Sequence, residues 1–202
     1  MAWNTTHNKE ATAPSSKQLP VGAPIATNPA YTGKGYSDSW SIERAYQEGM
    51  RKVTWVFRCI DAIAGNQARL PMVLRDDNSP EGKIIKDDDI LKILNSRANM
   101  GEDSFIFRFR LSAQMLMSTR GVFVEVIRGR NGKPVSLHLL PPQYTAPIPD
   151  PKTFVSGYEV VLPTGDRQRL RPEQVIWLRK PHPLDPYRSL TPLEAAGMAI
   201  EI

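Results

Sequence analysis

The chain has 202 residues, 26 of them lysine or arginine and 21 aspartate or glutamate, which gives a formal net charge of +5. This length and the 41% hydrophobic content suit one compact domain plus an arm, and the mild basic excess permits a polyanionic partner without requiring one. The single cysteine, Cys59, excludes an intrachain disulfide and a cysteine zinc cluster. We expect a reducing compartment, a Cys59 thiol buried as a small hydrophobic group, and no membrane span, because no apolar run is long enough.

Residues 1–40 predict a flexible, extended arm. They are rich in small and polar residues and contain several prolines, without helical or strand periodicity. Tyr31, Tyr36 and Trp40 lie near the end of this arm. These aromatic residues indicate either docking onto a neighbouring protein or anchoring on the chain's own domain.

Helical patterns follow the arm. One helix is expected from Ser41, and a second from Val53 to about Ala68, where Leu70-Pro71 ends it. The apolar residues of this second helix recur at intervals of three and four and predict one buried face: Val53, Val56, Phe57, Ile60, Ile63 and Ala64. Short strands are expected at Met72–Leu74 and Lys83–Ile85 around a polar turn.

Three consecutive carboxylates, Asp87 to Asp89, precede the apolar run from Ile90 to Leu94. This placement favours capping of a helix N-terminus, and a divalent-cation site is the alternative. A further helix is predicted from about Glu102 to Thr119, with apolar residues on several sides and therefore buried from more than one direction.

The second half of the sequence predicts strands. A hairpin over Val122–Arg128 and Val135–Leu140 is indicated by the Asn131-Gly132 turn. Further strands are expected at 143–148, 157–162, 167–170 and 175–179, and a last helix begins at Thr191-Pro192 and runs to Ile202. The fold class is therefore α+β, with N-terminal helices packed on a β-rich domain.

The sequence contains no usable pattern for catalysis, and we expect no catalytic residue, cofactor or metal ion. Gly33-Lys34-Gly35 lacks the strand and helix that flank a phosphate-binding loop. His7, His138 and His182 lie far apart in the sequence, without a companion at ligand spacing. The sequence therefore indicates a structural or binding protein.

Basic residues are the more suggestive feature. They predict either a DNA-facing surface or ordinary solvent-facing positions of a helix and a hairpin. The candidates are Arg108, Arg110, Arg120, Arg128, Arg130 and Lys133.

Several motifs in this order resemble the portal proteins of long-tailed bacteriophages. The helix with Trp55 and Cys59 that closes at Pro71, the Gly121 strand start, the Leu-x-Pro step at Pro141, and the loop with Leu190 and Pro192 are similar to the family's pattern. The resemblance covers roughly Trp40 to Ile202. Ser189 stands where the family usually has glycine, and Val122-Phe123 replaces the common Asn-Ala.

This resemblance implies a ring, typically of twelve subunits, at one capsid vertex of a virion assembled in the host cytoplasm. The ring would contact the major capsid protein, the terminase large subunit that carries the packaging ATPase, the head-tail connector proteins, and double-stranded DNA passing through it. Residues 41–190 would form a wing-like domain, and residues 191–202 would begin a helix toward stem and clip regions. Arg108, Arg110 and Arg120 would then meet a neighbouring subunit or the capsid.

Two other functions stay open from the residues. A stand-alone nucleic-acid-binding module would use the basic β-rich face and would bind in a salt-sensitive way. An enzyme would require a pocket that joins Asp87 to Asp89 or His138 to other reactive groups.

Overall fold

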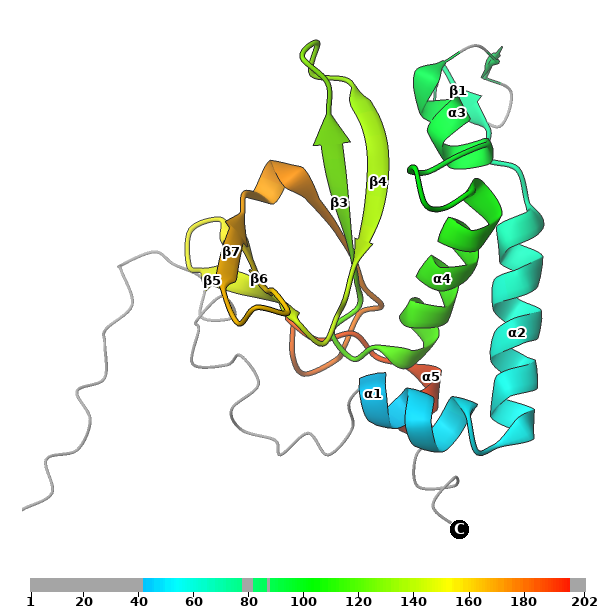
Figure 1. Cartoon of the computed structure of the whole chain (residues 1–202), viewed down its shortest axis with the longest axis vertical. Helices are drawn as coiled ribbons and strands as arrows, with labels where there is room; N and C mark the ends of the chain where they lie inside the picture. The colour runs from blue at the N-terminus through cyan, green and yellow to red at the C-terminus, as the bar shows by residue number, and fades with distance from the viewer. Residues whose placement is uncertain (1–41, 78–81, 87, 197–202) are drawn as a thin grey trace, which may run out of the picture.

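The computed structural model describes residues 42–77, 82–86 and 88–196 (Figure 1). These residues form helices followed by antiparallel sheets, which confirms the α+β class. The predicted arm over residues 1–40, Asp87, and the continuation of the last helix beyond Ala196 lie outside the described residues.

The N-terminal part is a helical layer. Helix α1 (Ile42–Arg44) passes directly into a π-helical turn, η3 (Ala45–Met50), where the sequence predicts a single α-helix. Helices α2 (Thr54–Arg69) and α4 (Ser104–Met117) then lie side by side (Figure 1). The buried residues between these helices and α5 (Pro192–Ala195) are mostly small or aliphatic, which allows close packing: Ala45, Ile60, Ala64, Ala113, Met117 and Leu193.

The helix boundaries follow from local chemistry. Leu70 takes an extended conformation (φ −71°, ψ 125°) after α2, because the residue before a proline is disfavoured in the helical region. Asp88 caps α3 (Asp89–Asn95) by accepting a hydrogen bond from the Ile90 backbone N–H at 2.9 Å. The capping role predicted for the acidic run is confirmed at Asp88.

The chain then forms two three-stranded antiparallel sheets, β4-β3-β8 and β5-β6-β7, besides the short pair β1 (Leu74–Arg75) and β2 (Ile84–Ile85). The longer strands and the 3-10 turn η4 are β3 (Val122–Arg128), β4 (Pro134–Leu140), β5 (Thr145–Asp150), β6 (Phe154–Val161), β7 (Arg167–Leu170), η4 (Pro172–Gln174) and β8 (Val175–Leu178). The predicted hairpin at Asn131-Gly132 is confirmed by the pairing of Val126 with Leu137 in the β3–β4 ladder.

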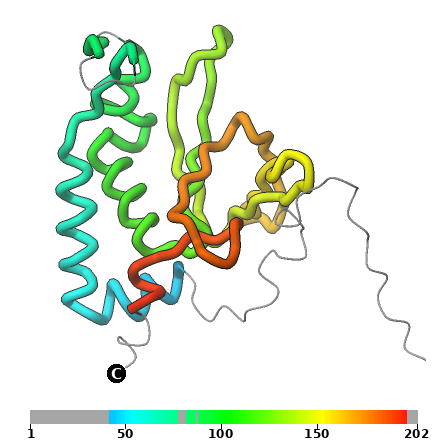
Figure 2. Tube along the Cα trace, turned by 180° about the vertical axis from the view of Figure 1, so that it is seen from behind, coloured from blue at the N-terminus to red at the C-terminus, as the bar shows by residue number. Residues whose placement is uncertain are grey.

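The β3 strand divides its side chains between two cores, because alternate residues of a strand point to opposite faces. Val122, Val124 and Val126 pack toward α3 and α4 together with Phe107. Phe123 points the other way, into the core between the two sheets. The β4-β3-β8 sheet therefore lies between the helical layer and the β5-β6-β7 sheet, as Figures 1 and 2 show from opposite sides.

The β5–β6 hairpin differs from its predicted bounds. Strand β6 begins at Phe154 rather than Gly157, because Asp150 closes a tight turn. The Asp150 carboxylate accepts hydrogen bonds from the backbone N–H groups of Lys152 and Thr153, both at 2.8 Å. Phe154 leaves this turn with a positive φ of 69°, a conformation that disfavours large side chains.

Candidate functional site

The six basic residues predicted from the sequence do not form one surface. The fold separates them into a helical group (Arg108, Arg110), a position between the sheets (Arg120), and the tip of the β3–β4 hairpin (Arg128, Arg130, Lys133). Their contact with a neighbouring subunit or with DNA stays a prediction.

Arg108 is buried, with 9% of its surface exposed. Its guanidinium donates to the backbone oxygen of Ser104 at 3.1 Å and to that of Leu70 at the end of α2. Because the bond to Leu70 joins α4 to the carbonyl group just after the end of α2, Arg108 stabilises the helix pair.

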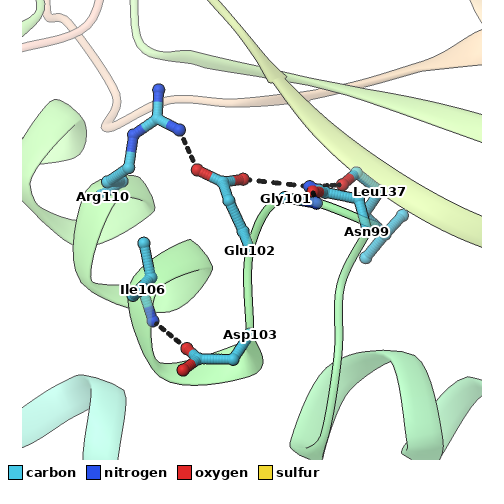
Figure 3. Close-up of polar contacts among 7 residues, drawn as sticks. All are labelled: Asn99, Gly101, Glu102, Asp103, Ile106, Arg110 and Leu137. Atoms are coloured by element: carbon cyan, nitrogen blue, oxygen red, sulfur yellow. Dashed lines mark hydrogen bonds and ion pairs between the residues drawn. The ribbon is translucent and has the colours of Figure 1, made fainter.

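Arg110 belongs to a polar network that docks the loop before α4 onto the sheet (Figure 3). Its guanidinium pairs with Glu102, whose other carboxylate oxygen accepts a hydrogen bond from Asn99 Nδ2 at 3.0 Å. Asn99 Nδ2 also donates to the backbone oxygen of Leu137 on β4 at 2.8 Å, and Leu137 N–H donates to the backbone oxygen of Ala98 at 2.9 Å. The loop thus extends the edge of β4, and Arg110 supports it.

Arg120 lies in the turn between α4 and β3. Its side chain donates to the backbone oxygen of Thr145 on β5 at 3.3 Å, and its own backbone oxygen accepts the indole N–H of Trp177 at 2.8 Å. Arg120 therefore connects β8 of one sheet with β5 of the other.

The hairpin tip carries the three remaining cations. Arg128 donates to the backbone oxygen of Gly132 at 3.2 Å, and the turn is closed by a backbone hydrogen bond from Gly129 to Lys133 at 2.9 Å. Gly132 has a φ of +76°, which glycine adopts without strain. The turn chemistry thus brings Arg128, Arg130 and Lys133 together at one end of the molecule, where all three are exposed.

An aromatic cluster with an arginine lies between the two sheets. Phe154 stacks on Tyr187 with ring centroids 4.5 Å apart, and Trp177 stacks on Phe123 at 5.7 Å. The Arg179 guanidinium lies 4.3 Å from the Trp177 ring centroid and 4.9 Å from that of Phe154. This cluster joins β6, β8 and the loop that leads to α5.

Burial in this cluster changes the pKa of three groups. It raises the pKa of Tyr158 and of Tyr187, and nearby Arg179 partly offsets both changes. It lowers the pKa of Arg179, whose Nη1 atom is buried without a hydrogen-bond partner among the described residues. The cluster is therefore a partly desolvated contact between the two sheets.

The first family-motif residues lie on α2 and at its end. Trp55 is 80% exposed, and the Cys59 thiol is exposed as well. The prediction that Cys59 is buried is wrong, because α4 covers the face of α2 that carries Ile60 and Ala64 and leaves Cys59 on the outer face. Phe57 and Ile63, also predicted to be buried, are 42% and 52% exposed for the same reason.

The later motif residues shape tight connections. Gly121 has a φ of +79°, and a Cβ atom there would collide with the backbone oxygen of Leu178. The backbone oxygen of Pro141 accepts a hydrogen bond from the Thr145 hydroxyl at 2.9 Å. Pro192 occupies the first turn of α5, which Thr191 caps through a 3.1 Å hydrogen bond from Glu194 N–H. The predicted Thr-Pro start of this helix is confirmed.

The loop before α5 is anchored by a residue that departs from the family pattern. Ser189 is fully buried, and its hydroxyl accepts the Lys180 backbone N–H at 3.0 Å. Its own N–H donates to the backbone oxygen of Thr119 at 2.6 Å, while Leu190 beside it is 42% exposed. Serine at this position thus makes a hydrogen bond that glycine lacks.

Two grooves flank α4. One, of about 470 Å³, lies against α2 and includes Gly65, Phe105 and Phe109. The other, of about 540 Å³, lies against η3 and β4 and includes Tyr46, Phe109 and Pro141. Phe109 lines both, so α4 presents side chains to each groove.

The histidines of the described residues have local roles. His138 Nε2 lies 3.0 Å from the Ser136 hydroxyl, and His182 Nδ1 accepts backbone N–H groups of its own loop. Within residues 42–77, 82–86 and 88–196, no three His, Cys, Asp or Glu side chains gather in a way that suits a metal ion. No helix of the same ranges has the length and apolar character needed to cross a membrane.

Sequence reasoning missed the cluster around Arg179. The spacing of Trp177, within β8, and Arg179, just after it, was a usable signal, because residues two apart in an extended segment share a face. Tyr187, in the loop before α5, had no such signal, since its contact with Phe154 joins positions 33 residues apart.

The family model described as phage portal protein matches residues 54–202. No curated protein matches the chain. Among solved structures, the neck of an empty GTA particle computed with C6 symmetry matches with a TM-score of 0.73 and 23% identity, over 90% of this chain and 48% of that chain.

The neck of the native GTA particle computed with C12 symmetry matches with a TM-score of 0.67 and 22% identity, over 81% of this chain and 42% of that chain. The virion of a native gene transfer agent particle matches with the same TM-score and identity, over 83% and 42%. The chain spans less than half the length of the chains that it matches in these structures. At such identity the likeness is one of fold.

Proposed function

The chain belongs to the phage portal protein family, and on this premise we propose that it is part of the structural subunit of a portal ring at a capsid vertex. Such a ring is the conduit for double-stranded DNA during packaging and ejection. The observation that carries the proposal is the family match, which extends from the start of α2 to Ile202. The particle necks of similar fold, computed with C6 and C12 symmetry, support it.

A ring of identical subunits requires two different contact surfaces on each copy, because a cyclic interface is heterologous for every order above two. The helical layer and the β5-β6-β7 sheet lie on opposite sides of the chain (Figure 1). The outer face of α2, with Trp55 and Ile63 exposed, adds apolar surface on one side. This arrangement suits a subunit that contacts neighbours on both sides.

We further propose partners and roles for the parts of the chain. Residues 41–190 form the wing-like domain, residues 1–40 an arm toward an adjacent subunit, and residues 191–202 the start of a helix toward stem and clip regions. The partners are eleven further copies of the chain in a ring of twelve, the major capsid protein, the terminase large subunit and the head-tail connector proteins. The subunit is not an enzyme, because the terminase supplies the ATPase, and it assembles in the host cytoplasm into the virion.

The test is negative-stain imaging of the natural-length gene product, purified at high concentration. We expect closed rings with a central hole. A persistent monomer that binds DNA tightly at low salt would contradict the proposal and favour the stand-alone nucleic-acid-binding module.

A further inference from the structure

The β3–β4 hairpin extends beyond the sheet to which it belongs. Strand β3 pairs with β8 only from Val122 to Glu125, whereas its pairing with β4 continues to Arg128 and Pro134. Beyond the Val126–Leu137 pair, where the loop before α4 still binds β4, the hairpin is therefore a two-stranded ribbon. Its tip projects at one end of the molecule (Figure 1).

The ribbon tip is positively charged. The six residues from Arg128 to Lys133 have the sequence Arg-Gly-Arg-Asn-Gly-Lys, with three cations and no acidic residue. Backbone hydrogen bonds and Asn131, whose side chain accepts the Lys133 N–H at 3.0 Å, hold the turn. No hydrogen bond among the described residues involves the Arg130 side chain, which is exposed.

Two carboxylates at the start of α3, Asp88 and Asp89, already have partners within the chain. Asp88 caps α3, and Asp89 pairs with Lys92 at 3.1 Å. Lys92, and secondarily Lys133, lower the pKa of Asp89. Asp89 therefore has Lys92 as its ion-pair partner, and no ion pair between Asp89 and Arg128 or Arg130 is present among the described residues.

We propose that the β3–β4 ribbon binds the phosphodiester backbone of double-stranded DNA through Arg128, Arg130 and Lys133, without reading its sequence. Arginine, lysine and asparagine are typical phosphate contacts, and a two-stranded ribbon fits the major groove. A protein partner fits less well, because the six tip residues carry three cations and no aromatic or aliphatic side chain; the exposed aliphatic residues of the ribbon, Ile127 and Val135, lie just before and after them. The inference rests on the proposed function, which brings DNA to the subunit.

The salt dependence of binding measures these contacts. Each phosphate contact contributes about −0.9 to the slope of log K against log salt concentration, so three contacts give about −2.7. Affinity should then fall about 40-fold between about 50 and 200 mM salt.

The experiment compares the chain with the triple variant Arg128→Gln, Arg130→Gln and Lys133→Gln by fluorescence anisotropy on a labelled duplex. The control is Arg167→Gln, Arg169→Gln and Arg171→Gln, which removes the same charge from exposed positions at and just after β7. We expect the slope of log K against log salt concentration to move from about −2.7 toward zero in the tip variant and to stay at about −2.7 in the control.

Equal loss in both variants would overturn the proposal, because net charge alone would then explain binding. An unchanged slope in the tip variant, or tighter binding of the chain to poly-glutamate than to the duplex, would overturn it too. Ring formation by the natural-length protein carrying each triple substitution is imaged separately. If the tip variant forms rings but has lost DNA binding, both proposals are supported. If the unsubstituted protein forms no rings, the proposed portal function is contradicted, whereas the proposed DNA contact of the ribbon is still judged by the anisotropy measurement.

Discussion

The indole Nε1 of Trp177 donates a hydrogen bond to the backbone oxygen of Arg120 over 2.8 Å, and so ties β8 to the turn that follows α4. The same ring stacks on Phe123 and lies under the Arg179 guanidinium. Replacing Trp177 with phenylalanine keeps an aromatic ring but removes the donor. We expect the free energy of unfolding to fall by about 1 to 2 kcal/mol, measured by urea denaturation.

The matched control is Trp55→Phe, because Trp55 is 80% exposed. A surface substitution of this kind changes stability by less than about 0.5 kcal/mol. Equal losses in the two variants would refute the role assigned to the Trp177 hydrogen bond.

Gly121 follows Arg120, whose backbone oxygen accepts the Trp177 hydrogen bond. The backbone conformation at Gly121 does not tolerate a side chain. Its φ is +79°, and a Cβ atom would meet the Leu178 backbone oxygen and the Arg179 side chain. We expect Gly121→Ala to lower the free energy of unfolding by about 3 kcal/mol, from backbone strain plus displacement of β8.

Substitution of Gly165 separates the cost of backbone strain from the cost of a steric clash. It has a φ of +89°, and no atom lies within 4 Å of the place that a Cβ atom would occupy. Gly165→Ala should therefore cost only the strain, about 1 to 2 kcal/mol. If Gly121→Ala costs no more than Gly165→Ala in urea denaturation, the contact with Leu178 does not constrain the fold.

The local elements were predictable where one short pattern decides them. The largely apolar segment from Val122 to Arg128 predicted the bounds of β3 correctly, because the burial of both faces from Val122 to Val126 selects apolar residues along a central strand. Leu70-Pro71 ended α2 and Asp88 began α3 for reasons confined to a few neighbouring residues.

The side-chain environments were not predictable, since they depend on which faces the fold covers. Helix α2 carries apolar residues on two faces, and only the position of α4 decides that Ile60 is buried while Cys59 and Ile63 are exposed. Likewise, charge alone could not separate Arg108, which bonds to the end of α2, from Arg130, which lies at an exposed tip.

The reactivity of the Cys59 thiol tests whether the outer face of α2 is exposed. Because it is exposed on α2, we expect a thiol reagent to modify the folded chain completely and at nearly the rate measured in denaturant. If the thiol reacts only after the chain unfolds, then Cys59 is buried, as expected from the sequence. Cys59→Ser serves as the unreactive control.

Burial of Tyr158 predicts a dependence of stability on alkaline pH. Burial raises the pKa of Tyr158 in the folded chain, whereas the unfolded tyrosine ionises near its ordinary pKa of about 10. From about pH 10 up to the higher folded pKa, the unfolded chain releases a proton that the folded chain keeps, so the free energy of unfolding falls as pH rises.

Tyr158→Phe should therefore lose less stability than the unsubstituted chain between about pH 8 and about pH 10.5. Tyr144→Phe is the matched control for the loss of a tyrosine hydroxyl, because Tyr144 is 52% exposed. Urea denaturation at the two pH values measures both. Identical pH dependence in the Tyr158 variant and the control would contradict the predicted effect of burial.

The stack of Phe154 on Tyr187 should be an energetic link between β6 and the loop before α5. Phe154 holds a positive φ of 69°, its ring centroid lies 4.5 Å from that of Tyr187, and its backbone oxygen accepts the Tyr187 hydroxyl at 3.0 Å. A double-mutant cycle with Phe154→Leu and Tyr187→Leu, measured by urea denaturation, should give a coupling energy of about 1 kcal/mol from stacking. The hydrogen bond to the Phe154 backbone oxygen is lost with Tyr187 in either background and does not enter the coupling energy.

The matched pair for this cycle is Phe105 and Phe109, whose ring centroids lie 6.2 Å apart in a tilted arrangement. Because this pair lacks the close parallel stack, it should couple by less than about 0.5 kcal/mol. Equal coupling in the two pairs would mean that the Phe154 conformation contributes nothing specific to the link. The loop before α5 would then be held by Ser189 and its two hydrogen bonds instead.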